Sequence, residues 1–260
     1  SRDLAQCMPM TNSWHKRVLK NFGAAAPNYN NEAQLQKTFA WRLAQMCSRR
    51  SIPKGIWVDL GAGTGLLAEA LEALNPKQSV LRVDGCKEML AQNRPQSQKQ
   101  LWDLNLGLPT WPNPPALIAS SFALHWLKQP TNRIEEWFSA LRPGGWLAIA
   151  LPINGSFPEW HLAAKTSGIP CTAIPLPSKE TLLKSLNAKN IHYQRLHTFT
   201  QKASGVRSLL KPMVKVGAQS SQQVRLSVGD WRKLQRDWPS STRNGTIKLT
   251  WLIQLLLVQR

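Results

Sequence analysis

Residues 56–71, IWVDLGAGTGLLAEAL, decide the fold because an apolar stretch, a glycine-rich turn and a helical pattern follow one another without a break. Three glycines, Gly61, Gly63 and Gly65, occupy alternate positions of the turn. Glycine tolerates positive φ angles and lets a ligand touch the main chain directly. The free N–H groups at the start of the following helix face the same place. The stretch therefore predicts a ligand-binding turn at the carboxyl end of a strand.

The alternation of strand and helix continues beyond this stretch. We expect strands at 79–86 and 146–152, a strand within 116–127 that runs into a loop, helices at 66–76 and 87–95, and a helix within 131–145 that Pro-Gly-Gly closes. Apolar segments that alternate with helical segments are typical of a parallel sheet whose helices pack on both faces. The segment 51–152 is therefore predicted to form the ligand-binding core of an α/β domain.

The regions on either side of the core are predicted to extend the same domain. Residues 14–50 carry an apolar stripe at helical spacing, so we expect segment 1–50 to form an N-terminal helical lid. In segment 153–260 we expect a helix at 178–190 capped by Ser178, strands at 191–200 and 247–258, and helical stretches at 205–219 and 227–239. This C-terminal part would complete the sheet and add a small helical insertion as a substrate cap.

The composition limits the classes of partner. The net charge is +19, divided as +7 over residues 1–150 and +12 over residues 151–260. Such a field favours nucleic acid, an anionic membrane surface or an acidic protein, although a basic proteome explains it equally well. The chain shows no apolar run of membrane-spanning length and no secretory signal, so we expect a cytoplasmic protein without a membrane partner. The four cysteines stand apart from one another, which argues against a metal site or a disulfide framework.

The chemistry of the turn narrows the ligand. Asp84 ends the next expected strand, and a carboxylate there can accept hydrogen bonds from both ribose hydroxyls of a nucleoside. A dinucleotide-binding turn has Gly or Ala at the sixth position of its fingerprint, where this chain has Leu66. A phosphate-binding Walker loop is excluded because no G-K-[ST] follows. The residues thus favour a nucleoside other than a dinucleotide.

The core segment resembles the class I S-adenosylmethionine-dependent methyltransferases. In that family an acidic residue ends the strand before G-x-G-x-G, and Asp59 fills this place. Further motifs of the family resemble VDGCKEML at 83–90, LWDLNLGLP at 101–109, IASSFALHWL at 118–127 and ALRPGGWLAIA at 140–150. Cys86 stands where the family commonly has Ser. The resemblance implies a Rossmann-like, mostly parallel seven-stranded sheet and S-adenosylmethionine as the cofactor.

The resemblance also implies roles for single residues. Asp84 would hold the ribose, Met89 would line the adenine and Asp103 would meet the adenine amino group. Trp126 would lie near the methyl group. The implied cofactor-binding residues are Asp59, Gly61, Gly63, Gly65, Asp84, Met89, Asp103, Ser121 and Phe122. No metal is implied.

Each of these residues also has an ordinary structural explanation. Gly65 can serve only the entry into the helix, and Asp59 can cap the loop by accepting backbone N–H groups. Asp84 can be a surface residue, and Asp103 can form a turn. The residues that can simply end a strand are Ser120, Ser121, His125 and Trp126.

The two ends of the chain resemble a narrower family, the malonyl-acyl-carrier-protein O-methyltransferases of biotin synthesis. FGAAAPNYNNEAQLQ at 22–36 is similar to that family's F-x-x-A-A-x-x-Y opening and the A-x-L-Q helix after it. INGSFPEWHLA at 153–163 and VRSLLKPMVKVGA at 206–218 are similar to segments of its tail. Leu210 and Pro212 depart from the family's pattern, and the segment 230–239 matches it only loosely.

This narrower resemblance implies an acceptor, the free carboxylate of a malonyl thioester on an acidic acyl-carrier protein. Arg207 would clamp that carboxylate, and Tyr29 of the lid would close over the methyl donor. Lys211 and Lys215 would dock the carrier's acidic face. The ordinary alternatives are an Arg207 on the surface, a Tyr29 that only fills the lid joint, and solvated lysines.

Other functions stay open at this point. A methyltransferase of nucleic acid would use the positive charge, but no Asn/Asp-Pro-Pro-Tyr-type motif follows the strand at 116–127. The acceptor could also be another small acid. A third alternative is a non-catalytic protein that binds the cofactor or a partner without turnover.

Overall fold

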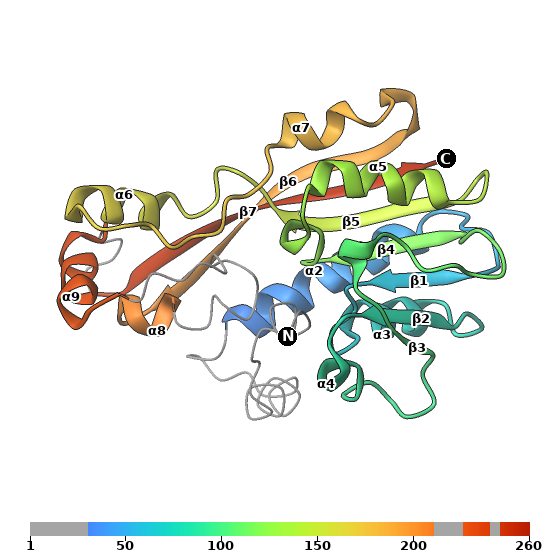
Figure 1. Ribbon diagram of the computed structural model, residues 1–260, viewed down its shortest axis with the longest axis horizontal. Helices are drawn as coiled ribbons and strands as arrows, with labels where there is room; N and C mark the ends of the chain where they lie inside the picture. Colours follow the sequence, from blue (N-terminus) through green and yellow to red (C-terminus); the bar gives the residue numbers. More distant parts are fainter. Residues whose placement is uncertain (1–30, 211–225, 240–244) are drawn as a thin grey trace.

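The computed structural model describes residues 31–210, 226–239 and 245–260. Its centre is a seven-stranded sheet with the strand order β3-β2-β1-β4-β5-β7-β6 (Figure 1). The strands are β1 Trp57–Leu60, β2 Val80–Asp84, β3 Lys99–Leu101, β4 Leu117–Ser121, β5 Trp146–Pro152, β6 Ile191–Ala203 and β7 Ile247–Gln259. β1 to β5 pair in parallel, whereas β7 runs antiparallel to both β5 and β6. The predicted α/β fold with a Rossmann-like, mostly parallel sheet is confirmed.

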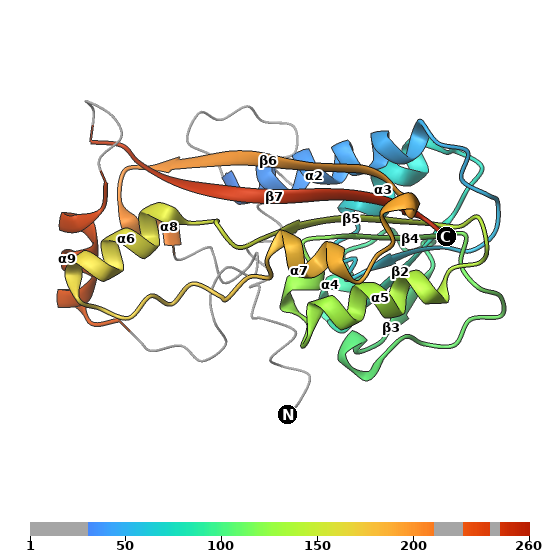
Figure 2. The ribbon, with the colours of Figure 1, turned by 90° about the horizontal axis from the view of Figure 1, so that it is seen from above.

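Helices cover both faces of this sheet (Figure 2). The helices are α2 Asn31–Ser48, α3 Leu66–Leu74, α4 Lys87–Leu90, α5 Pro130–Ala140, α6 Pro158–Ser167, α7 Lys179–Lys184, α8 Val206–Leu210 and α9 Val228–Asp237. Buried side chains of α2 and α3 join the core on one face, and those of α5 and α7 join the core on the other. Strand β5 divides its buried side chains between the two cores by alternation, as a strand buried on both faces must.

Helix α2 confirms the described part of the predicted N-terminal helix. Leu35, Phe39 and Leu43 recur every four residues and are fully buried. They pack in the core that α2 shares with α3 and the sheet. The remainder of that prediction, residues 14–30, lies outside the described residues.

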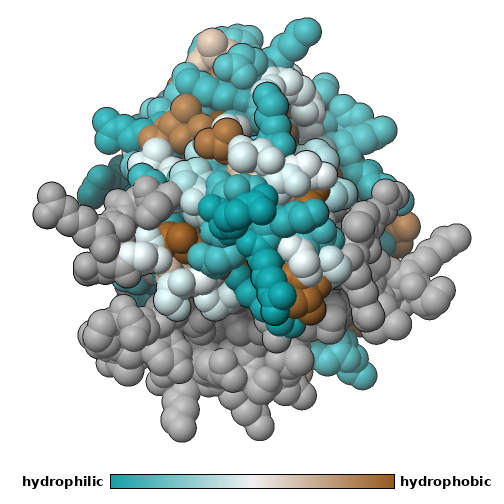
Figure 3. Space-filling model, turned by 90° about the vertical axis from the view of Figure 1, so that its left-hand side faces the viewer, coloured by the Kyte–Doolittle hydropathy of each residue, from teal (hydrophilic) through white to brown (hydrophobic). Residues whose placement is uncertain are grey.

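The ladder between β6 and β7 runs beyond the rest of the sheet. β7 pairs with β5 only over Ile253–Gln259, but it pairs with β6 as far as Ile247. The projecting strand segments 198–203 and 247–252 carry α6, α8 and α9, and we call this unit the cap (Figure 1). Figure 3 views the cap end of the molecule and shows a mostly hydrophilic surface with small, separate hydrophobic areas. The predicted C-terminal strands and the helix within 227–239 are thus confirmed, and α8 confirms the predicted stretch 205–219 as far as Leu210. Residues 211–219 of that stretch lie outside the described residues.

A short polar segment anchors α6 of the cap to β7. Ser156 Oγ donates to Leu252 O at 3.1 Å and accepts from Leu252 N at 2.9 Å. The Glu159 carboxylate accepts from Thr250 N at 2.8 Å and from Thr250 Oγ1 at 2.7 Å. Pro158 occupies the first turn of α6, where a missing N–H costs nothing. These contacts with β7 therefore explain Ser156 and Glu159 within the segment INGSFPEWHLA.

Three elements depart from the expected pattern. Helix α4 ends at Leu90, whereas the expected helix continues to residue 95. β3 has the sequence KQL, and its side chains are exposed or half-buried, so no apolar pattern marks it. The helix capped by Ser178 is confirmed, since Ser178 Oγ accepts from Thr181 N at 3.1 Å, but α7 ends at Lys184 instead of continuing to residue 190. A short 3₁₀ turn at Ala188–Asn190 follows it.

The cysteines correct one expectation. Cys47 and Cys171 are free, as expected. Cys86 is disulfide-bonded, so the expectation that no cysteine forms a disulfide is wrong for this residue. Cys7 lies outside the described residues. In the described part of the chain, no helix is both long and apolar enough to cross a membrane.

Candidate functional site

The glycine turn follows β1 at the carboxyl edge of the parallel strands. Gly61 N and Ala62 N both donate to Val83 O of β2, at 2.8 and 3.0 Å, so the turn bends towards the end of the neighbouring strand. Gly61, Gly63 and Gly65 have φ angles of 74°, 55° and 90°. All three lie in the left-handed region, where residues with a side chain are strained. The predicted conformational reason for the glycines is confirmed.

The three glycines are also required by neighbouring side chains of the protein itself. A Cβ at Gly61 would lie 2.2 Å from Ala123 Cβ, and one at Gly63 would lie 2.8 Å from Met89 Cε. A Cβ at Gly65 would lie 1.9 Å from Asn93 Oδ1. The turn is thus packed against the loop after β4 on one side and against α4 and the residues after it on the other.

Asp84 faces the turn from the end of β2. Its Oδ2 accepts from Gly63 N and its Oδ1 accepts from Cys86 N, both at 2.8 Å. Burial raises the pKa of this carboxyl, and the two backbone hydrogen bonds oppose the shift. A carboxylate oxygen has a second lone pair, so each oxygen can still accept a hydroxyl. The donor and acceptor groups here therefore fit the ribose of a nucleoside.

Asp59 lies behind the turn and not at its front. Its side chain is only 1% exposed, and Oδ2 accepts from Ala68 N in the first turn of α3 at 3.2 Å. Burial raises the pKa of Asp59 to about 7, against the opposing charge of the Arg82 guanidinium. The contact observed for Asp59 is therefore that of a cap, which is the ordinary structural explanation of this residue.

The end of β4 lies beside the turn. Ser120 Oγ donates to Leu60 O at 2.7 Å, which ties β4 to the last residue of β1. Phe122 has a φ of 55°, a strained value for a residue with a side chain, and its N–H donates to Ala150 O at 2.8 Å. Ser121 Oγ is buried and has no hydrogen-bond partner among the described residues.

An aromatic cluster surrounds Phe122. Its ring centroid lies 6.0 Å from that of Phe39 in α2, 6.1 Å from that of Trp251 in β7 and 6.4 Å from that of His125. The cluster joins the N-terminal helix, the loop after β4 and the cap strand at one place. Phe39 is a fully buried core residue that packs against Phe122.

Asp103 and Met89, which the resemblance assigns to the adenine, lie near the end of β2 and beside the turn. Trp102 N donates to Asp84 O at 3.0 Å, which places Asp103 next to the residue paired with the end of β2. Asp103 Oδ1 accepts from Asn105 N at 2.9 Å and so begins a 3₁₀ turn. Met89 is half-buried in α4 with its methyl group against Gly63. Both stay candidates for the adenine pocket.

Of the predicted catalytic residues, Trp126 lies beside this group and Arg207 lies away from it. Trp126 is half-buried and stacks on His125 with ring centroids 6.0 Å apart. Arg207 has an exposed side chain on α8, which lies in the cap and away from β1 (Figure 1). Tyr29, Lys211 and Lys215 lie outside the described residues.

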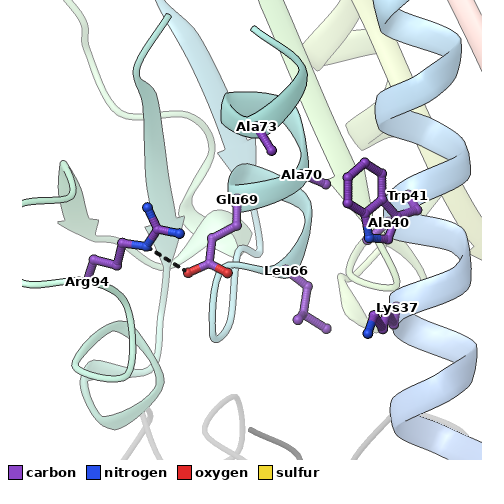
Figure 4. Close-up of a pocket in the computed structure, with 8 residues that line it drawn as sticks. All are labelled: Lys37, Ala40, Trp41, Leu66, Glu69, Ala70, Ala73 and Arg94. Carbon is purple, nitrogen blue, oxygen red and sulfur yellow. Dashed lines mark ion pairs between the residues drawn. The ribbon is translucent and has the colours of Figure 1, made fainter. Parts of the chain in front are cut away.

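A pocket of about 250 Å³ opens between α2 and α3 (Figure 4). Its lining consists of Lys37, Ala40, Trp41, Leu66, Glu69, Ala70, Ala73 and Arg94. Among these residues, Glu69 and Arg94 form an ion pair at 3.6 Å on the side of α3 that faces away from α2. Leu66 follows the glycine turn directly, but none of Asp84, Met89, Asp103 and Phe122 lines the pocket. The pocket is thus separate from the groups that fit a nucleoside. Among the described residues, no group of three or more His, Cys, Asp or Glu could hold a metal ion.

Sequence reasoning also misses two buried polar residues behind the turn, Arg82 and Asn93. The signal for Arg82 is a single charge inside the apolar strand VLRVD. Such a charge predicts a buried partner, because an unpaired buried charge is costly. Asn93 carries no comparable signal, since its role depends on contacts across the sheet edge.

Comparison with known proteins gives several matches. Residues 58–149 match a family described as a methyltransferase domain. The chain is 35% identical over 165 residues to the biotin biosynthesis bifunctional protein of Bordetella avium, covering 57% of this chain and 33% of that protein. It is 25% identical over 259 residues to a malonyl-[acyl-carrier protein] O-methyltransferase of a Marinomonas species, covering 95% of both chains. It is 34% identical over 128 residues to a trans-aconitate 2-methyltransferase of Variovorax paradoxus, covering 48% of this chain and 49% of that protein.

A solved structure shares the fold over nearly the whole chain. Magnesium protoporphyrin IX methyltransferase from Synechocystis, crystallised with bound S-adenosylhomocysteine, aligns with a TM-score of 0.57 and 11% identity. The alignment covers 98% of this chain and 99% of that one. At this identity the likeness concerns the fold alone.

Proposed function

Because the chain belongs to the class I S-adenosylmethionine-dependent methyltransferases, we propose that it methylates the free carboxylate of a malonyl thioester carried by an acidic acyl-carrier protein. The observation that carries this acceptor is the match to the Marinomonas protein along 95% of both chains, because it includes the lid and the cap as well as the core. The charge of +12 in residues 151–260 supports an acidic partner for the C-terminal part.

In the proposed reaction, the main contribution of the protein is to position the two reactants. S-adenosylmethionine supplies an electrophilic methyl group on a sulfonium, and its nucleoside fits Asp84 and the glycine turn. A carboxylate acceptor is already anionic near neutral pH, so no general base is needed. Holding the acceptor oxygen in line with the methyl group can contribute about 7–11 kcal/mol. The chain's own tasks are then to fix the nucleoside, orient the acceptor and exclude water.

The acceptor side of this proposal assigns three residues. Arg207 clamps the malonyl carboxylate, Tyr29 closes over the donor, and Trp126 lies near the methyl group. Arg207 is on the cap and exposed, which suits a group that meets an incoming carrier-bound substrate. In this proposal the part 153–260 carries the substrate side of the enzyme, the segment 1–50 is its lid, and 51–152 is the core that binds the cofactor.

A second candidate acceptor is a small polycarboxylic acid. The similarity to the Variovorax trans-aconitate 2-methyltransferase favours this acceptor, because the sequence identity is 34%, against 25% for the Marinomonas protein. That similarity covers only about half of each chain, and residues 151–260 carry the larger share of the positive charge. The carrier-bound acceptor therefore accounts for more of the molecule.

The test is a transfer assay with radiolabelled S-adenosylmethionine. The protein is incubated separately with malonyl-carrier protein, a free malonyl thioester, trans-aconitate and bulk RNA. Base-labile label on the carrier-bound malonyl group supports the proposal. Label on trans-aconitate or RNA identifies another acceptor, and donor binding without transfer to any of them identifies a non-catalytic protein.

A further inference from the structure

A buried polar network lies directly behind the glycine turn. Arg82, in the middle of β2, is 0% exposed. Its Nη1 and Nη2 donate to the two carboxylate oxygens of Glu72 in α3, each at 2.8 Å. Its Nε donates to Asn93 Oδ1 at 3.1 Å. The guanidinium therefore joins α3 to the segment that follows α4.

Asn93 passes this contact on to the turn. Its Nδ2 donates to Gly63 O at 3.0 Å and to Leu90 O at 3.2 Å. Gly63 is consequently held at both of its polar atoms, because its N–H donates to Asp84 Oδ2 and its carbonyl accepts from Asn93. The carboxylate that fits the ribose and the network behind the turn thus meet at one residue.

The orientation of the Asn93 amide follows from the chemistry of Arg82. A guanidinium has only donors, so Asn93 must turn its oxygen towards Arg82. Its NH₂ group is then left to face the carbonyl of Gly63. Glu72 fixes the guanidinium through a two-point contact and also accepts from Val80 N at 3.0 Å.

We propose that Asn93, oriented by Arg82, is a positioning residue for donor binding: it holds Gly63 so that the Asp84 carboxylate meets the ribose. The same geometry gives a second reason for the third glycine of the turn. Gly65 lacks a side chain to admit the Asn93 amide, since a Cβ there would lie 1.9 Å from Asn93 Oδ1. The proposal rests on binding of S-adenosylmethionine and not on the identity of the acceptor.

The decisive variant is Asn93→Asp. It has nearly the same shape and keeps an oxygen for Arg82, but it cannot donate to Gly63 O. We expect the dissociation constant for S-adenosylhomocysteine, measured by calorimetry, to rise about tenfold, as the loss of the buried hydrogen bond that holds Gly63 O implies. The control is Glu159→Gln, which also exchanges a carboxylate and an amide at a buried position. It weakens the contacts of Glu159 with Thr250 in the cap. The control should lower the melting temperature and leave the dissociation constant unchanged.

A double-mutant cycle covers the case in which Asn93→Asp folds poorly. Gly65→Ala is made in the wild type and in Asn93→Ala, and ligand binding is measured in all four proteins. We expect Gly65→Ala to weaken binding less when Asn93 is absent, because the clash with its oxygen is gone; the strain from the φ of 90° remains.

Three results would overturn the proposal. They are an unchanged dissociation constant in a folded Asn93→Asp, equal loss of affinity in Asn93→Asp and Glu159→Gln, and additive losses in the cycle. If the wild type binds the ligand but methylates no malonyl group, the proposed acceptor fails and this positioning role stands.

Discussion

The edge of the sheet around the glycine turn and the cap use buried polar groups in opposite ways. At the edge, charged side chains accept from the main chain of the turn or of the helix that follows it, as Asp84 does from Gly63 and Asp59 from Ala68. In the cap, Glu159 attaches a helix to β7, and the remaining charge stays on the surface, as at Arg207. The buried polar groups of the first region hold the binding turn in place. Those of the cap only attach a helix to β7, and its charged side chains such as Arg207 are exposed to solvent.

This difference separates the expected effects of substitutions. Changes at the edge should alter stability together with binding of the methyl donor. Changes within the frame of the cap should alter stability alone, and changes on its surface should alter use of the acceptor. The following four variants test that separation.

The largest effect is expected for Gly65→Ala. The substitution combines a strained φ of 90° with a clash against Asn93, which Arg82 and Gly63 hold in place. We expect the free energy of unfolding in urea to fall by about 4 kcal/mol. Gly168→Ala is the matched control, because Gly168 has a φ of 68° with no atom within 4 Å, and it should cost about 1 kcal/mol. Equal losses would show that the clash is relieved without cost.

A pH-dependent effect is expected for Asp59→Asn. The folded pKa of Asp59 is raised from 3.8 to about 7, so between these values the folded state binds more protons than the unfolded state. The contribution of Asp59 to the free energy of unfolding is therefore greatest below pH 4. It falls as the pH rises towards 7 and is constant at higher pH. Asparagine stays neutral, so the variant should gain about 4 kcal/mol relative to the wild type between pH 4 and 8. A gain that does not change with pH would contradict the raised pKa.

A smaller effect, confined to stability, is expected in the cap for Thr250→Val. The variant keeps the shape of the side chain and removes the hydroxyl that donates to Glu159 Oε2 at 2.7 Å. We expect a loss of about 1–2 kcal/mol in the free energy of unfolding. Calorimetry should show unchanged affinity for S-adenosylhomocysteine; a weaker affinity would mean that the cap and the donor site are coupled.

The smallest effect is expected for Arg207→Ala. The side chain is exposed, so stability should hardly change. If Arg207 clamps the acceptor carboxylate, the KM for the malonyl substrate should rise about tenfold, with donor affinity unchanged. Arg232→Ala, an exposed arginine on the neighbouring α9, is the control and should leave this KM unaltered. Similar rises in both variants would indicate a general effect of charge instead of a clamp.

Much of the fold could be predicted because its elements carry local patterns. β1, β2, β4 and β5 are apolar segments between helical ones, and all of them lie where the alternation places them. β3 could not be predicted, because its exposed KQL sequence carries no apolar pattern and only pairing with β2 defines it.

The site divides in the same way. The glycines and Asp84 follow from strand ends and spacing, and their meeting is observed. The contact of Asn93 with Gly63 joins residues 30 positions apart and depends on how α4 packs against the turn, which no local pattern encodes. Arg207 matches a motif, but a motif in an exposed helix fixes no contact with the site.

The central claim is that the turn and Asp84 form the binding site for the methyl donor, and calorimetry with S-adenosylmethionine tests it most directly. The wild type should bind the donor, and Asp84→Ala should bind it about 100-fold more weakly, because it loses charged hydrogen bonds to the ribose. A wild type that does not bind, or an Asp84→Ala variant that binds as tightly as the wild type, would contradict the account.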